Sequence, residues 1–151
     1  MAVDLRAATS VDAARIAEIL LASRKTFLRY APSRHPDDEV RSWVRDELLA
    51  SQQVTVALVH GQIIGVLAVA QIQGVSWITQ LYLDPFFVGR GIGSRLLSRT
   101  VATALRPIRL YTFQQNLGAR RFYERNGFVP IKFSDGSSNE EGCPDVLYEL
   151  A

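Results

Sequence analysis

The order of apolar and polar residues divides the chain into a helical first part and a later part with the pattern of strands. A short run at Val3–Arg6 predicts a first strand. Apolar residues then recur at helical spacing, which predicts a helix from about Asp12 to Leu28. Two prolines within Tyr30–Pro36 indicate a loop, and a second amphipathic helix is predicted from Asp37 to Leu49.

After Gln53 the apolar runs become shorter and richer in β-branched residues. Turn residues such as His60-Gly61 separate them, as in consecutive hairpins. The predicted strands are Val54–Val59, Ile63–Ile72 and Val75–Leu83. Together they predict an antiparallel meander.

The last part alternates helices with strands. A glycine-rich loop leads into a helical pattern that reaches Leu105 and is stopped by Pro107. The elements predicted after it are a strand at Arg109–Phe113, a helix at Asn116–Asn126 closed by Gly127, and strands at Phe128–Phe133 and Val146–Leu150. We therefore expect one mixed α+β domain over residues 1–151, with a mostly antiparallel sheet of about six to seven strands and about four helices.

Composition agrees with a globular protein and excludes several other classes. The chain has 151 residues, of which 48% are hydrophobic and 21% charged, so disorder and disulfide scaffolds are excluded. Apolar runs such as Ile63–Ala70 are too short for a membrane span, and no signal peptide is visible. The single cysteine, Cys143, fits a reducing cytoplasm. Fifteen arginines against two lysines indicate a GC-rich, bacterial genome.

Charge is unevenly distributed although the net charge is only +2. Residues 85–132 carry nine basic side chains against Glu124 alone, and residues 133–151 carry five acidic side chains and no basic one. This pattern predicts an anionic ligand and also suits a cationic one. The alternative is a set of solvated helix faces with pairing inside the molecule.

The loop Val88-Gly-Arg-Gly-Ile-Gly93 is the strongest candidate for ligand binding. Glycines let the backbone approach an anion closely, and the following helix directs free N–H groups at it. A Walker P-loop is excluded because no lysine precedes Ser94. The dinucleotide fingerprint has a different glycine spacing and an acidic residue about where Arg109 stands. A glycine turn without a ligand is the remaining alternative.

Two segments together resemble the GNAT superfamily of N-acetyltransferases. The glycine loop matches the family's Gln/Arg-x-x-Gly-x-Gly/Ala motif except at Val88, where the family usually has Gln or Arg. Residues 116–128 match its Asn-x-x-Ala-x-x-Phe-Tyr-x-x-x-Gly-Phe motif. The resemblance is clearest over Val75–Phe133, and it implies the GNAT fold and acetyl-CoA as co-substrate, without a metal.

The resemblance also implies roles for individual residues. Leu81, Tyr82 and Leu83 would pair with the pantetheine arm through backbone groups. The pyrophosphate would lie on the loop and helix start, formed by Val88, Gly89, Arg90, Gly91, Ile92, Gly93 and Ser94. Arg90, Arg95 and Arg125 are candidate phosphate ligands. Asn116 would bind the pantetheine or position the acetyl group, or act as a helix N-cap.

Tyr123 would protonate the departing thiolate as general acid, with core packing beside Phe122 as the alternative. No general base is identified, and the candidates are Glu140, Glu141, Asp145, His35, Thr79, Gln80 and a water chain. We expect the segment Asn139–Asp145 to fold over the acceptor pocket, where its carboxylates would attract a cationic acceptor. Phe27, Tyr30, Trp43 and Trp77 are candidate acceptor-pocket residues, with core packing favoured for Trp43.

The predicted function is therefore transfer of an acetyl group from acetyl-CoA to a primary amine of a small molecule or peptide. A catalytically silent acyl-CoA-binding regulatory module is the alternative. A nucleic-acid binder is a third class, but the chain lacks the aromatic interleaving and reading motifs of such proteins, so no nucleic-acid partner is expected. No membrane partner is expected either. The sequence does not determine the oligomeric state, and a homodimer is one option.

Overall fold

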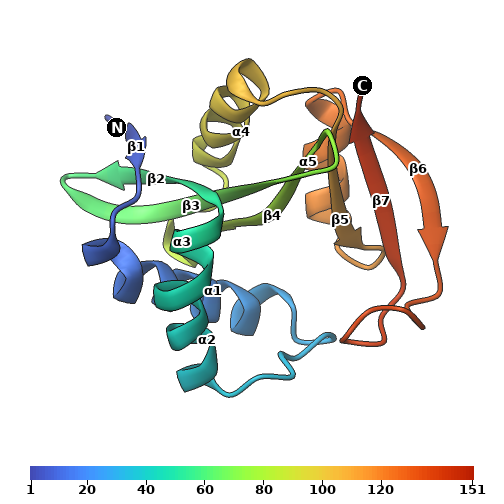
Figure 1. The fold of residues 1–151 in the computed structure, drawn as a ribbon, viewed down its shortest axis with the longest axis horizontal. Coiled ribbons are helices and arrows are strands. Elements are labelled where there is room, and N and C mark those ends of the chain that lie inside the picture. Colours follow the sequence, from blue (N-terminus) through green and yellow to red (C-terminus); the bar gives the residue numbers. More distant parts are fainter.

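A single seven-stranded sheet runs through the molecule, with strand order β1-β2-β3-β4-β5-β7-β6 (Figure 1). The computed structural model describes all residues, 1–151. Only the β4–β5 pair is parallel, and all other neighbours are antiparallel. The strands are β1 (Asp4–Ala7), β2 (Gln53–Val59), β3 (Gln62–Ile72), β4 (Val75–Leu83), β5 (Ile108–Phe113), β6 (Val129–Ser134) and β7 (Asp145–Leu150). The predicted α+β class and the β2–β4 meander are confirmed.

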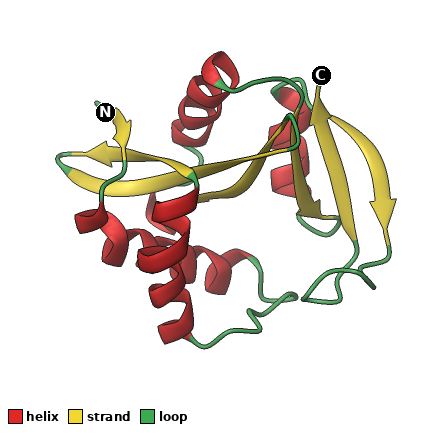
Figure 2. Cartoon of the chain, in the orientation of Figure 1, coloured by secondary structure: helices red, strands yellow, loops and turns green.

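Helices cover both faces of the sheet (Figure 2). They are α1 (Ala13–Phe27), α2 (Asp37–Trp43), α3 (Leu49–Ser51), α4 (Ile92–Thr103) and α5 (Leu117–Arg125). A π-helical turn at Val44–Leu48 joins α2 to α3, so these form the one continuous helical stretch that the sequence predicts. The α4 helix ends at Thr103, before the predicted Leu105, which lies outside the helix and is exposed.

Each face of the sheet has its own hydrophobic core. On one face, α1 and the α2–α3 stretch bury residues such as Ile16 and Val66. On the other, α4 and α5 bury residues such as Leu97 and Leu110. Burial on this scale is the main favourable contribution to folding, and it fixes where the ends of α1, α4 and α5 meet the sheet.

A β-bulge at Thr79 changes the direction of β4. Gln80 pairs with Ala68 of β3 and Ile78 pairs with the next residue, Val69, so Thr79 is the extra residue. The side-chain alternation shifts as a result, since Ile78 and Leu81 contribute to the same core although they are three residues apart. Bulges bend the strand that carries them, and this one lies where β4 leaves β5.

The parallel β4–β5 pairing is short for the same reason. It includes only Ser76 with Ile108 and Trp77 with Arg109. Past these pairs the two strands separate, and the gap between them opens toward the ends of α1 and α5 (Figure 1). The gap between β4 and β5 therefore results from the bulge and from the early end of their pairing.

Ser76 anchors the closed end of this gap. Its side chain is fully buried, its Oγ donates to the Leu105 carbonyl at 2.6 Å, and its backbone N–H donates to the Pro107 carbonyl at 3.0 Å. Gln71 Nε2 donates to the same Oγ at 2.9 Å. Ser76 thus ties the connection between α4 and β5 to the beginning of β4.

Replacing Ser76 with alanine should lower the free energy of unfolding by about 1–3 kcal/mol, because the Leu105 carbonyl and the Gln71 amide lose their partner. Denaturant unfolding measures the change. The exposed Ser98→Ala on α4 is the matched control, and it should change stability by less than about 0.5 kcal/mol. Equal stability of Ser76→Ala and wild type would contradict the anchoring role.

Candidate functional site

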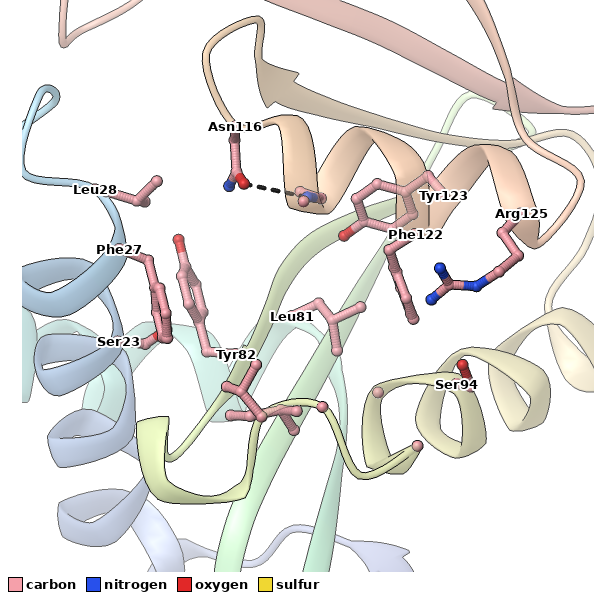
Figure 3. A pocket seen from close by; sticks show the side chains of 17 residues that line it. Ser23, Phe27, Leu28, Leu81, Tyr82, Ser94, Asn116, Phe122, Tyr123 and Arg125 are labelled. Carbon is pink, nitrogen blue, oxygen red and sulfur yellow. Dashed lines mark hydrogen bonds between the residues drawn. The ribbon is translucent and has the colours of Figure 1, made fainter.

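A cleft of about 500 Å³ follows the separated part of β4. It is bounded by the end of α1, the loop before α4, the beginning of α4 and the inner face of α5 (Figure 3). Its walls are formed by Ser23, Phe27, Leu28, Leu81, Tyr82, Leu83, Val88, Gly89, Gly91, Gly93, Ser94, Asn116, Gly118, Ala119, Phe122, Tyr123 and Arg125. The cleft brings together both sequence motifs, which are separated by 22 residues in the chain.

The backbone of β4 presents unpaired hydrogen-bonding groups to this cleft. Asp84 N–H donates to the Ile64 carbonyl of β3 at 2.8 Å. Backbone groups of an antiparallel strand point to opposite sides at successive residues, so those of Leu83 and Leu81 point away from β3. They face the gap toward β5, whose pairing with β4 stops at Trp77. An extended ligand could take the place of the missing strand.

The glycine loop forms an anion-binding site at the start of α4. Gly89 and Gly91 have φ angles of +81° and +80°, a region that side chains other than glycine rarely adopt. Gly91 is the N-cap residue, and the first helical hydrogen bond runs from Arg95 N–H to the Gly91 carbonyl at 3.2 Å. The N–H groups of the first turn before Arg95 therefore lack partners inside the helix, and the helix dipole favours an anion in front of them.

The side chains around this loop differ in what they offer a ligand. Val88 lines the cleft and is 47% exposed, so an apolar group stands there. Arg90 does not line the cleft, because its guanidinium lies over the Phe86 ring at 5.0 Å from the centroid. Ile92 is fully buried in the core, so only its backbone can contact a ligand.

Tyr123 lies in the wall of the cleft on α5, with 8% of its surface exposed. Its ring packs against Phe122 and Phe128 with centroid distances of 5.2 and 5.8 Å. Its hydroxyl points into the cleft and makes no hydrogen bond within the chain (Figure 3). Burial, with a smaller contribution from nearby Tyr82, raises the pKa of Tyr123 well above its ordinary value. The phenol is therefore protonated throughout the physiological pH range.

Asn116 is the N-cap of α5. Its Oδ1 accepts a hydrogen bond from Ala119 N–H at 3.1 Å. Its Nδ2 points away from the helix toward the cleft (Figure 3). The two roles considered for this side chain are thus geometrically compatible, because they use different atoms.

The four aromatic residues predicted to line the acceptor pocket lie in different parts of the structure. Phe27 lines the cleft, whereas Trp77 stacks on Tyr111 with a centroid distance of 5.6 Å at the closed end of the β4–β5 gap. Trp43 packs against the core under α1, as the sequence favours. Tyr30 lies edge-on to Phe113, with its hydroxyl buried and without a partner, and burial raises its pKa.

The acidic segment before β7 was expected to fold over the acceptor pocket, but none of residues 139–145 lines the cleft. The segment contacts the loop after α1 and the end of α1 instead, and its carboxylates are already paired. Glu140 contacts His35, Glu141 lies 3.5 Å from Arg24, and Asp145 accepts a hydrogen bond from Ser134. The hydrogen bond to Glu140, with a second one to Glu39, raises the pKa of His35. These contacts do not support the prediction that the carboxylates attract a cationic acceptor.

Sequence reasoning named Phe27 at the end of α1 but missed Ser23 and Leu28, which also line the cleft. Ser23 is a buried polar residue on the apolar side of α1, and Leu28 is the C-cap residue. A polar residue at helical spacing within an apolar stripe was the available signal.

No group of three or more His, Cys, Asp or Glu side chains is arranged to hold a metal ion. No helix has the length and apolarity required to cross a membrane.

Comparison with known proteins gives the family. A family model described as the acetyltransferase (GNAT) family matches residues 17–128, and no curated protein matches the sequence. The PaiA N-acetyltransferase from Thermoplasma acidophilum, solved with coenzyme A, has a TM-score of 0.77 and 22% identity, covering 99% of this chain and 98% of that one. YncA from Salmonella typhimurium, solved with its cofactor acetyl-CoA, has a TM-score of 0.78 and 19% identity, covering 99% and 94%.

A GNAT acetyltransferase from Staphylococcus aureus has a TM-score of 0.78 and 20% identity, covering 98% of each chain. These likenesses show a shared fold along the whole chain. The family model extends from α1 to the end of the second motif, and so includes the separated strand, the glycine loop and Tyr123. The chain belongs to the GNAT family of acetyltransferases.

Proposed function

We propose that this protein transfers an acetyl group from acetyl-CoA to a primary amine. The observation that carries the proposal is the single cleft in which free backbone groups of Leu81 and Leu83, the glycine loop and the Tyr123 hydroxyl converge. A pyrophosphate on the loop and a pantetheine arm along β4 would bring a thioester to Tyr123. Two similarly folded proteins solved with coenzyme A or acetyl-CoA support this assignment.

The residues divide the work of cofactor binding. Backbone N–H groups of the first turn of α4 would hold the pyrophosphate, which makes the missing Gln or Arg at Val88 tolerable. Arg125 lines the cleft, and its guanidinium lies over the Phe122 ring at 5.9 Å from the centroid, so it can reach a phosphate at the edge of the site. Asn116 Nδ2 would donate to a carbonyl oxygen of the pantetheine or of the acetyl group.

The reaction forms a C–N bond and breaks the C–S bond of the thioester. The nitrogen loses a proton to water, and the sulfur leaves with increasing negative charge. Tyr123 would donate its proton, or a hydrogen bond to the same sulfur, and recover it from solvent. Because a thiol has an ordinary pKa of about 8.5, its thiolate needs only modest help.

A silent acyl-CoA-binding module would have the same cleft but would not need a free hydroxyl beside the thioester. One assay series separates the two. Calorimetry with acetyl-CoA tests binding, and a screen of amines and peptides with detection of released thiol tests transfer. Acetyl-CoA binding together with thiol release supports the proposal. Acetyl-CoA binding without thiol release in the presence of any amine favours the silent binding module. Absence of binding at millimolar acetyl-CoA contradicts both. The free thiol of Cys143 fits the cytoplasmic setting expected for such an enzyme.

Gly91→Glu should weaken acetyl-CoA binding at least about a hundredfold, since a carboxylate in front of the helix start repels a pyrophosphate by several kcal/mol. Gly91→Ala is the matched control, because it carries the same strain from the φ of +80° but no charge. It should bind acetyl-CoA at least tenfold more tightly than the glutamate variant does. Calorimetry on both folded variants makes the comparison, and equal dissociation constants would refute the loop assignment.

Tyr123→Phe should lower kcat by roughly tens- to a hundredfold, the lower part of the range for general acids. The acetyl-CoA dissociation constant and Tm should stay nearly unchanged, because the hydroxyl has no hydrogen bond within the chain to lose. Steady-state kinetics and thermal unfolding test both statements. A decrease in kcat of less than about threefold would make Tyr123 a packing residue.

A further inference from the structure

A second, smaller cavity of about 110 Å³ adjoins the cleft at the β4–β5 gap. The two share Leu28, Leu81, Tyr82, Asn116, Ala119 and Tyr123. The residues that belong to the small cavity alone are Ile78, Thr79, Gln80, Thr112 and Phe113. Because Tyr123 lines both cavities, a molecule in the small one would lie beside a thioester held in the cleft. If the proposed function is right, this cavity holds the amine.

The walls of this acceptor cavity contain no Asp, Glu, Lys, Arg or His. Their polar side chains are neutral: Thr79, Gln80, Thr112 and Asn116, with the phenols of Tyr82 and Tyr123. The Thr79 hydroxyl already donates to Gln52 Oε1 outside the cavity. An ammonium ion placed among such groups loses hydration without gaining an ion pair, so the cavity favours the neutral, nucleophilic form of the amine.

A positive charge lies directly behind one wall of the cavity. Arg24 Nη1 lies 3.4 Å from the Tyr82 hydroxyl, and its Nη2 donates to the Ala31 carbonyl at 3.2 Å. Glu141 lies 3.5 Å from the same guanidinium, and its side chain is 17% exposed. Glu140 is held by His35. Glu141 is thus paired with Arg24 and Glu140 is hydrogen-bonded to His35, so a second positive charge on the acceptor beside the Tyr82 hydroxyl would meet Arg24.

We infer that the acceptor is a compact primary amine whose body carries no charge, bound among Ile78, Thr79, Gln80, Thr112 and Phe113, with Leu28 limiting its length. This inference rests on the proposed function. It disfavours polyamines, which would bury a second ammonium near Arg24. It also disfavours amino acids, because Arg24 already has Glu141 as its carboxylate partner.

Leu28 is the barrier at the outer end of the acceptor cavity. Its side chain is 6% exposed, and it lines the cleft, the acceptor cavity and an outer groove of about 360 Å³. The outer groove lies between α1 and the loop after it, beside Arg24 and His35. Shortening Leu28 would join the acceptor cavity to this groove and extend the space for the acceptor.

Three amines of equal chain length test the charge preference: butylamine, 1,4-diaminobutane and 4-aminobutanoate. Thiol release should give a kcat/KM for butylamine at least about tenfold above either charged compound. A higher value for the diamine or for the aminobutanoate overturns the inference while leaving the proposed function intact. No release with any amine, peptide amines included, contradicts the proposed function instead.

Gln80→Glu places a carboxylate in the cavity with almost no change of shape. It should raise the ratio of kcat/KM for 1,4-diaminobutane over butylamine by about tenfold or more. Gln115→Glu is the matched control, since Gln115 is exposed and lines neither cavity, and it should leave the ratio unchanged. An unchanged ratio in Gln80→Glu, or an equal rise in both variants, would show that the amine does not bind in this cavity.

Leu28→Ala should raise the ratio of kcat/KM for octylamine over butylamine by about tenfold. Tm and the acetyl-CoA dissociation constant are measured alongside, because Leu28 is buried and also lines the cleft. The ratio compares two amines on one variant, so a general loss of stability or of acetyl-CoA binding cancels from it. A ratio equal to that of wild type refutes the role of Leu28.

Discussion

Beyond Trp77, β4 has no hydrogen-bond ladder to β5, and the unpaired backbone groups at Leu81 and Leu83 determine what the molecule can bind. Unpaired groups of this kind are costly when buried, so the gap is stable only where water or a ligand can reach it. The strand order places the opening in the interior of the sheet and not at its edge, and the bulge at Thr79 lies where the opening begins. A peptide-like arm can then bind as a strand would, between two cores that hold the walls apart.

The same helix supplies both packing and chemistry on the far wall. Tyr123, Phe128 and Tyr148 form an aromatic cluster that fixes α5 against β7, with ring centroids 5.8 and 6.2 Å from Tyr123. Burial of the ring keeps the phenol protonated, and the position of α5 directs the hydroxyl into the cleft. A structural role for the ring and a chemical role for its hydroxyl are therefore compatible. Core packing and general acid catalysis, the two roles predicted for Tyr123 from the sequence, do not exclude each other.

Elements with strong periodicity could be predicted because their signals are local. The α1 stripe, the meander and the glycine loop before α4 all follow from neighbouring residues. The bulge was not predicted, since the adjacent polar pair Thr79-Gln80 breaks the alternation of Val75–Leu83 without showing whether the strand bulges or simply ends there. Contacts between distant segments, such as His35 with Glu140 or Arg24 with Glu141, also lie outside any local pattern. For the candidate site, the two motifs predicted most of the residues that line the cleft, whereas the adjoining cavity depends on three-dimensional packing between distant segments.

The distant pairs change the meaning of the charge pattern. From the sequence alone, the five acidic residues after Ser134 predict a site that attracts a cationic substrate. In the folded protein, Glu140 contacts His35 in the loop after α1, and Glu141 pairs with Arg24 in the last turn of α1. Desolvation is what makes this local cancellation important, because an unpaired charge beside a small cavity would dominate what enters it. Once these pairs have formed, the size of the cavity and its neutral hydrogen-bonding groups would determine which acceptor binds. The unpaired N–H groups in the first turn of α4 still attract anions. Under the proposed function, the cleft would therefore hold a highly charged cofactor and the adjoining cavity an uncharged acceptor body, without one interfering with the other.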